Sequence, residues 1–235
     1  MSEFAKMNHN KNYVDGSVAV KPVPCKTDGI SNVITKHTSR KLNMKVIALT
    51  GSAGSGKDTV ANILQLTNTN VFRHSFAKPL KEIAAKTFNL DPFYFDSDNP
   101  EREKIHPRWN KSPRQLLQIL GTDCLRELVD KDIWIKHAQD IYHLELHKYP
   151  KKSMFIITDC RFNNEAEWIK SIGGEIWEVK RNINLIEPTR QHNSKHASET
   201  SVDKKYITHT LENDNNDDDF RSLSLKVESL IKIKL

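Results

Sequence analysis

Cysteine is scarce in this chain of 235 residues, and the three that occur, Cys25, Cys124 and Cys160, form no CxxC pair. A disulfide framework is therefore not indicated, and we expect a reducing, cytoplasmic setting. Long apolar runs are absent as well, since no stretch approaches the roughly 18 residues that a membrane span needs. The polar first segment has no apolar core of the kind that a secretory signal requires.

Glycine and proline are few, at 8 and 9 residues, which excludes collagen-like and low-complexity classes. The 10 histidines are scattered, and neither zinc-ligand spacing nor a hydrolase triad emerges from them. A hydrophobic content of 37% leaves enough side chains for one core, and the length suits one globular domain.

The net charge of +6 is concentrated at one end, because residues 1–45 carry +5 and the remaining residues carry +1. Residues 1–43 also lack hydrophobic periodicity, so we expect a basic, disordered extension before a folded domain at 44–235. A solvated tail is the simpler interpretation, and weak contact with nucleic acid is the alternative. The acidic run at 214–219 lacks the spacing of a calcium loop and reads as a solvated turn.

The folded part alternates strand-like and helix-like segments, which predicts an α/β fold around a central parallel sheet. Apolar runs and helical periodicity separate the two kinds of segment. Strands are expected at 45–50, 71–76, 154–158, 175–180 and 206–211. Helices are expected at 57–66, 79–88, from 113 through Leu128, 132–148, 163–172 and 219–233, and 91–111 is expected to be a loop.

The strongest motif is Gly51-Ser-Ala-Gly-Ser-Gly-Lys-Asp-Thr59, which lies between a predicted strand and a predicted helix. Such a loop aims backbone N–H groups at phosphates, and the helix N-terminus favours an anion. Lys57 is expected to reach the outer phosphates of a nucleotide. The common pattern has Ser or Thr after the lysine, and that hydroxyl binds magnesium. This chain has Asp58 there and Thr59 one position later, so Thr59 is the candidate for magnesium although it departs from the pattern. A tight turn without nucleotide is the alternative. The predicted phosphate-binding residues are Gly51, Gly54, Ser55, Gly56, Lys57, Asp58 and Thr59.

A second group of polar residues follows the strand at 154–158. Asp159 ends that strand at the edge where open α/β sheets bind ligands, and such a carboxylate commonly holds magnesium. Arg161 is placed to reach a phosphate from the same edge, and Glu165 follows one turn later. For Asp159 alone, a helix cap is the competing interpretation.

A monophosphate acceptor would need a second cationic pocket, which arginine forms well because its guanidinium binds phosphate in bidentate fashion. Arg114 and Gln118 are one helical turn apart and face the same way. Lys78 and Lys81 are similarly spaced, with a solvated surface as an equally good interpretation. Trp109 and Phe76 are candidates for stacking on a base, although a core role suits Phe76 better.

The polar stretch 182–203 is predicted to form a lid that carries basic groups over a transferring phosphate. Its candidate residues are Arg181, Arg190 and His196. An exposed loop with a helix cap at Ser198 is the alternative.

With these segments assembled, the chain resembles the deoxynucleoside monophosphate kinases of bacteriophages, a P-loop family. The matching pieces are GKDTVA (56–61), FAKPLK (76–81), PRQLLQ (113–118), LGTD (120–123), TDCRFNNE (158–165) and HASE (196–199). They occur in the family's order and cover about 45–214. The resemblance implies a three-layer P-loop fold with an added helical acceptor-binding and lid region, and a viral source.

It also implies transfer of the γ-phosphoryl group of ATP to a deoxynucleoside monophosphate (dNMP), with Mg²⁺ as cofactor. The catalytic candidates are Lys57, Arg114 and Arg161. The acceptor is expected to contact Lys78, Arg114, Gln118, Asp159, Arg161 and Glu165. Thr59 and Asp159 are the metal candidates. A homodimer is left open by the sequence.

Two rival functions fit the same motifs. One is a related small-molecule kinase acting on phosphomevalonate or dephospho-coenzyme A, since the Arg-Gln helix does not exclude it. The other is a nucleic-acid-binding ATPase that uses the basic tail, which the nearly neutral folded region disfavours.

Overall fold

The computed structural model of the chain describes residues 44–68, 70–148, 153–181, 202–214 and 220–232. The predicted basic extension at 1–43 lies outside this part. Within it, no helix is both long enough and apolar enough to cross a bilayer.

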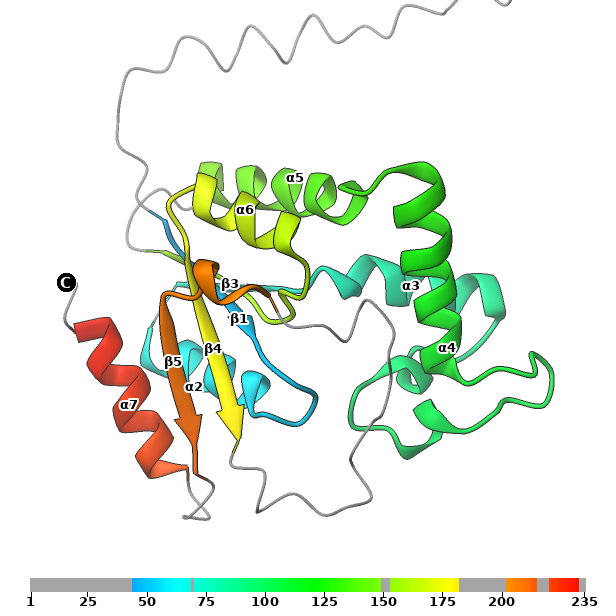
Figure 1. Cartoon of the computed structure of the whole chain (residues 1–235), viewed down its shortest axis with the longest axis horizontal. Helices are drawn as coiled ribbons and strands as arrows, with labels where there is room; N and C mark the ends of the chain where they lie inside the picture. The colour runs from blue at the N-terminus through cyan, green and yellow to red at the C-terminus, as the bar shows by residue number, and fades with distance from the viewer. Residues whose placement is uncertain (1–43, 69, 149–152, 182–201, 215–219, 233–235) are drawn as a thin grey trace, which may run out of the picture. The chain divides into compact units, whose positions relative to one another are not determined.

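Five parallel strands form the central sheet in the order β2-β3-β1-β4-β5 (Figure 1). The sheet is therefore of the α/β type that the alternating pattern predicted. Parallel strands need crossover connections, and the helices in the connections from β1 to β2, from β2 to β3 and from β3 to β4 cover both faces of this sheet. The strands are β1 (Lys45–Thr50), β2 (Val71–His74), β3 (Met154–Ile157), β4 (Glu175–Arg181) and β5 (His209–Asn213).

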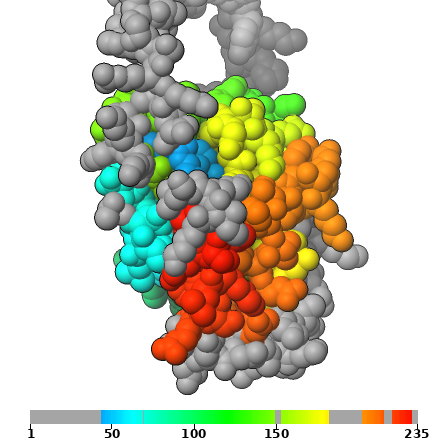
Figure 2. Space-filling model, turned by 90° about the vertical axis from the view of Figure 1, so that its left-hand side faces the viewer, coloured from blue at the N-terminus to red at the C-terminus, as the bar shows by residue number. Residues whose placement is uncertain are grey.

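Two buried clusters hold the three layers together, because successive side chains of each strand point to opposite faces. In β1, Ile47 and Leu49 pack under one helical layer, whereas Val46 and Ala48 pack under the other. The first layer contains α2 (Lys57–Thr67) and α7 (Arg221–Lys232), and α7 lies beside α2 and β5 (Figure 2). The second layer contains α3 (Ala77–Phe88), α5 (Ile133–Lys148) and α6 (Asn163–Ser171). The predicted three-layer fold is confirmed.

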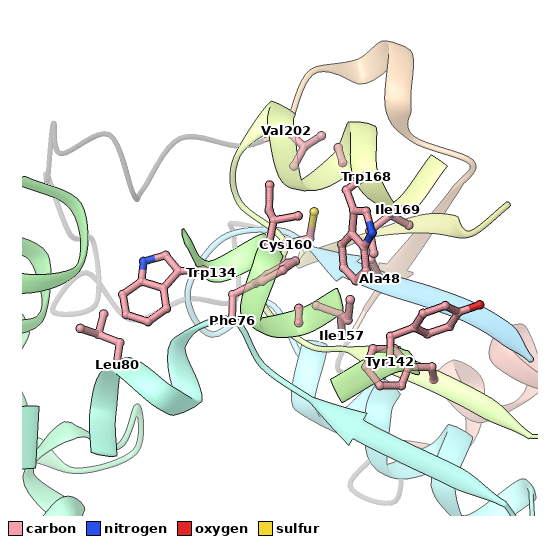
Figure 3. Close-up of a cluster of buried hydrophobic side chains, with 14 of the residues drawn as sticks. Ala48, Phe76, Leu80, Trp134, Tyr142, Ile157, Cys160, Trp168, Ile169 and Val202 are labelled. Carbon is pink, nitrogen blue, oxygen red and sulfur yellow. The ribbon is translucent and has the colours of Figure 1, made fainter. Parts of the chain in front are cut away.

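The second cluster joins the sheet to the long insertion between β2 and β3 (Figure 3). Phe76 meets Trp168 edge to face, with 6.1 Å between ring centroids. Trp134 and Leu80, which belong to the insertion, are part of the same cluster. The helices of the insertion are therefore anchored on the sheet by aromatic packing, which fixes where their polar residues stand.

The end of the second strand differs from its prediction at 71–76. The strand ends at His74, and α3 begins at Ala77 rather than at Pro79. The reason is Asp159, which accepts hydrogen bonds from the backbone amides of Phe76 and Ala77. These amides open a helix instead of continuing the sheet ladder.

The helix predicted from Pro113 through Leu128 divides into two parts. A capping box between Ser112 and Gln115 starts α4 (Pro113–Gln118), which continues as a π-helix, η3 (Ile119–Val129). The spacing of Leu116, Leu120, Cys124 and Leu128 predicts one apolar face, but Leu128 is 80% exposed, so that prediction is wrong at its end. Wider turns with i to i+5 hydrogen bonds change which residues share a face.

Two further segments differ in detail from their predictions. The expected loop at 91–111 contains the 3₁₀ turns η1 (Pro92–Phe95) and η2 (Pro100–Glu103). The strand expected at 206–211 is shifted to β5, because Lys204–Tyr206 forms another 3₁₀ turn, η7.

Candidate active site

The loop after β1 has the backbone that its glycines predict. Gly51 has a φ of 138°, and a Cβ there would stand 2.3 Å from the carbonyl oxygen of Val179. Gly56 has a φ of 102°, and a Cβ there would stand 2.4 Å from the side-chain amide nitrogen of Asn213. Only glycine fits both positions without strain. The loop thus passes close to β4 and β5 before it opens α2.

Lys57 folds back over this loop. Its Nζ donates hydrogen bonds of 2.9 Å and 2.7 Å to the carbonyl oxygens of Gly51 and Ser52. Arg181, at the end of β4, donates a 3.3 Å hydrogen bond to the carbonyl oxygen of Gly54. Two cations therefore lie on the phosphate loop, as expected for a site that binds polyphosphate.

The residue that replaces the usual Ser or Thr is tied to the neighbouring strand. Asp58 forms an ion pair with Arg73 of β2, which also donates a 2.8 Å hydrogen bond to the side chain of Asn62. Thr59 follows in the first turn of α2 and is half-buried. The side chain of Asp58 thus joins the start of α2, directly after the loop, to β2.

Asp159 acts as a helix cap, the alternative that its sequence position left open. Its carboxylate accepts hydrogen bonds from the hydroxyl of Ser75 at 2.7 Å and from the amides of Phe76 and Ala77 at 2.8 Å and 2.9 Å. Both oxygens are therefore bonded to the start of α3. Within the described residues, no group of three or more His, Cys, Asp or Glu side chains is arranged to hold a metal ion.

A cleft opens between α3, α4, η3 and the loop that follows β3, with about 600 Å³ of empty space that includes open solvent at its mouth. It brings together five of the six residues predicted to contact an acceptor, although they are far apart in the sequence. These are Arg114, Gln118, Asp159, Arg161 and Glu165. Arg102 and Arg126 also line it, so four guanidinium groups face two carboxylates, and the cleft suits an anion.

Arg114 is held in place on the cleft wall. Its side chain is 8% exposed, and its Nη1 donates a 2.8 Å hydrogen bond to Glu103 of η2. Gln118 stands one turn further along, and its buried Nε2 has no hydrogen-bond partner among the described residues. The α4 wall therefore offers a preoriented guanidinium and an uncommitted amide donor.

Glu165 lies at the floor of the cleft and is almost fully buried. Burial raises its pKa to about 7, whereas the charge of Arg126 and the amide of Arg161 act to lower it. One carboxylate oxygen accepts a 2.8 Å hydrogen bond from Arg126, and the other accepts bonds from the amides of Arg161 and Phe162. If Glu165 contacts the base or sugar as predicted, its carboxylate must accept that hydrogen bond in addition to the three bonds from Arg126, Arg161 and Phe162.

The aromatic candidates divide between the cleft and the core. Trp109 is outside the cleft, where its indole donates to the carbonyl of Phe88. Phe76 is buried in the core and lines the cleft. The buried Trp134 and the half-buried Phe162, which no sequence motif pointed to, line it as well. The indole N–H of Trp134 donates to the carbonyl of Gly121, a bond that no sequence pattern indicated.

Lys78 and Lys81 do not line this cleft. They belong to a second cleft, which Asp58, Ser75 and Thr158 also line. Lys81 is paired there with Asp96 at 3.1 Å. Of the predicted lid residues, Arg181 lies on the phosphate loop, whereas Arg190 and His196 fall outside the described residues.

Comparison with known proteins gives consistent matches. Residues 99–223 match the family model for deoxynucleotide monophosphate kinase. The "Putative deoxynucleotide monophosphate kinase" of Acanthamoeba polyphaga mimivirus is 34% identical over 146 residues, covering 59% of this chain and 75% of that protein. The deoxynucleoside-5'-monophosphate kinase of Escherichia phage T5 is 26% identical, covering 81% of this chain and 97% of that protein.

Solved structures with detectable likeness are more distant. A dephospho-CoA kinase from Campylobacter jejuni is 18% identical, with a TM-score of 0.42 and coverage of 80% of this chain and 97% of that one. A shikimate kinase from Bacteroides thetaiotaomicron is 14% identical, with a TM-score of 0.42 and coverage of 81% and 99%.

Proposed function

We infer that this chain, which belongs to the deoxynucleotide monophosphate kinase family, transfers a phosphoryl group from ATP to a deoxynucleoside monophosphate. The products are ADP and the deoxynucleoside diphosphate. We assign the whole activity to residues 44–235, as one domain.

The observation that carries the acceptor assignment is the pairing of Arg114 and Arg161 in one cleft. Arg161 follows β3, which is the neighbour of β1 in a parallel sheet, and β1 leads directly into the phosphate loop. Because ligands bind at the carboxyl edge of such a sheet, donor and acceptor phosphates can meet there. Each guanidinium can bind a phosphate through two parallel hydrogen bonds, so Arg114 and Arg161 together suit the phosphate dianion of the acceptor.

The donor nucleotide is assigned to the loop Gly51–Thr59. On binding, the phosphates would replace the carbonyl oxygens of Gly51 and Ser52 as partners of Lys57. Arg181 is a further cation on the same loop, and we propose that it contacts the transferring group together with Arg190 and His196 of the lid.

We propose that the site takes a magnesium ion shared with the nucleotide phosphates. Mg²⁺ in such sites takes one or two carboxylates, phosphate oxygens and water, and it needs no cage of protein ligands. Thr59 and Asp159 are the residues proposed to hold it, with Asp159 also keeping its bonds to α3. The ion would neutralise charge on the donor phosphates.

No general base is required in this proposal. The second pKa of a phosphate monoester lies near 6, so the acceptor is already mostly ionised at neutral pH. The residues of the chain contribute alignment and positive charge, with Lys57 on the donor side and Arg114 and Arg161 on the acceptor side. Gln118 and Glu165 are proposed to contact the base or sugar.

The test is a panel of deoxy- and ribonucleoside monophosphates with ATP and Mg²⁺, in which each diphosphate product is separated and measured. Diphosphate should form from at least one deoxynucleotide. Phosphomevalonate and dephospho-coenzyme A serve as competing acceptors in the same assay. Product from either of these but from no deoxynucleotide would reject the proposed substrate class.

A further inference from the structure

Arg126 is a buried arginine that the sequence motifs did not point to. Its side chain is 6% exposed, and its guanidinium carbon lies 4.0 Å from the centre of the Phe162 ring. Nη2 donates a 2.8 Å hydrogen bond to Glu165, and Nη1 donates a 3.0 Å bond to the carbonyl of Lys131. One N–H group of each terminal nitrogen is thus bonded to the protein, and these two bonds hold the guanidinium of Arg126 in one orientation.

Glu165 passes this contact on to the loop that carries Arg161. The carboxylate oxygen that does not meet Arg126 accepts hydrogen bonds from the amides of Arg161 at 2.8 Å and Phe162 at 3.1 Å. A chain of three groups therefore runs from Arg126 through Glu165 to the backbone of Arg161. The position of this backbone determines where the side chain of Arg161 starts and therefore where its guanidinium can reach.

The π-helix explains why Arg126 faces the cleft. Residues four and five apart share one side of a helix with i to i+5 hydrogen bonds. Gly121, Thr122 and Arg126 have this spacing, and all three are buried and line the cleft. A regular α-helix would place residues 121 and 126 on different faces.

A second contact fixes the same two segments. The side-chain amide of Asn164 donates hydrogen bonds of 3.2 Å to the carbonyl of Lys131 and 2.7 Å to the carboxylate of Asp132. η3 and the segment after it are therefore joined to the start of α6 at two points, and Arg126 of η3 provides the buried, charged one.

We propose that Arg126 is a positioning residue for the acceptor phosphate, acting through Glu165 on Arg161. The inference rests on the proposed function, because it needs Arg161 to bind that phosphate. Without Arg126, a buried carboxylate loses its counter-ion and must protonate or move. The amides of Arg161 and Phe162 then lose a fixed acceptor, and the Arg161 guanidinium is displaced.

The test compares Arg126→Met and Arg126→Lys with Arg108→Met by steady-state kinetics with ATP and a dNMP. Arg108 is an exposed arginine of the same insertion that stacks on Trp109 and lines neither cleft, so it is the matched control. Arg126→Met should raise the KM for the dNMP about tenfold or more, because small displacements of a phosphate-binding group are costly. Its KM for ATP should stay within about twofold of the wild-type value, and Arg126→Lys should lie between Arg126→Met and wild type.

Arg126→Met can fail to fold because it leaves Glu165 unpaired, so the double variant Arg126→Met with Glu165→Gln is measured as well. It removes both buried charges and should fold. Because Arg126 acts through Glu165, its KM for the dNMP should be raised selectively and should stay within about twofold of that of Glu165→Gln alone. Unchanged KM values in Arg126→Lys and in the double variant would overturn the proposal, as would equal rises for ATP and dNMP. Loss of activity in the wild type itself would instead reject the proposed function.

Discussion

The side-chain amide of Asn213 donates a 3.1 Å hydrogen bond to the backbone carbonyl of Ser55. This bond joins the last strand of the sheet to the middle of the phosphate loop, although the two residues are far apart in the sequence. Asn213 is 4% exposed, so the bond is shielded from water. The curvature of the loop therefore depends on β5 as well as on its own glycines.

Replacing Asn213 with Ala should raise the KM for ATP several-fold, about 3- to 10-fold, because a buried carbonyl loses its donor and the loop loses a support. The KM for the dNMP should stay near the wild-type value, since Asn213 does not line the acceptor cleft. Steady-state kinetics with each substrate varied in turn measures both. An equal effect on the two KM values would argue against a local role.

Gly56→Ala should damage the loop more than Asn213→Ala does. The new Cβ would stand 2.4 Å from the Asn213 amide, at a φ of 102° that disfavours any side chain. In the double variant Gly56→Ala with Asn213→Ala, the clash is removed and only the backbone strain remains. Thermal unfolding should therefore show the double variant to be at least as stable as Gly56→Ala alone, and a further loss would contradict the contact.

Lys57→Ala should lower kcat at least about 100-fold, because the cation that meets the transferring phosphates is removed. Lys86→Ala is the matched control, since Lys86 is exposed in the last turn of α3. The rate of ADP formation measures both variants. A Lys57→Ala enzyme with near-normal kcat would remove Lys57 from the mechanism.

Glu165 should make the stability of the protein fall as the pH rises. Its pKa is raised from 4.5 to about 7, chiefly by burial, so the folded state binds the proton more tightly than the unfolded state does. The stability that Glu165 contributes is fully present below about pH 4.5 and is lost as the pH rises through about 7. Denaturant titrations between pH 5 and pH 8 should show this loss, on the order of 1–3 kcal/mol, as the difference between the wild type and Glu165→Gln. The exposed Glu82→Gln should follow the wild type, and identical pH dependence in the wild type and in Glu165→Gln would refute the assignment.

His74 should make the stability of the protein fall as the pH falls, which is opposite to the effect of Glu165. Burial between His137 and Phe155 lowers its pKa from 6.5 to about 4, with the charge of Asp159 acting in the other direction and His137 and Lys78 in the same one. Between these two values the unfolded chain binds a proton that the folded chain does not, so stability falls as the pH falls. His74→Phe keeps a stacking ring without the proton. Its free energy of unfolding should fall less than that of the wild type between pH 6.5 and pH 4, and parallel curves would contradict this.

Local patterns were sufficient to predict the parallel sheet, the glycine-rich turn between β1 and α2, and most of the charged residues that the structure brings together in the cleft. β1 and β3 are short apolar runs buried on both sides, and the composition of such a run is enough to predict a buried parallel strand. Arg114 and Gln118 are on one face because four residues separate them. Asp159, Arg161 and Glu165 share an edge because they follow one strand.

The errors arose where a distant residue decides the local structure. β2 stops at His74 because Asp159, which is 85 positions later in the chain, caps the next helix. Lys78, which the sequence groups with the acceptor residues, lies in the second cleft, so its contact with an acceptor stays a prediction. Arg126 was missed because its role depends on the π-helical register and on Glu165, and neither is visible in a sequence window.

The binding of the acceptor phosphate by Arg161 is tested most directly by steady-state kinetics on the wild type and Arg161→Met. The dNMP concentration is varied at saturating ATP, and formation of the diphosphate is measured. The account predicts that the wild type forms the deoxynucleoside diphosphate. It also predicts that Arg161→Met raises the KM for the dNMP at least about tenfold while the KM for ATP changes little. Equal KM values for the dNMP in the two proteins, or no diphosphate from the wild type, would contradict it.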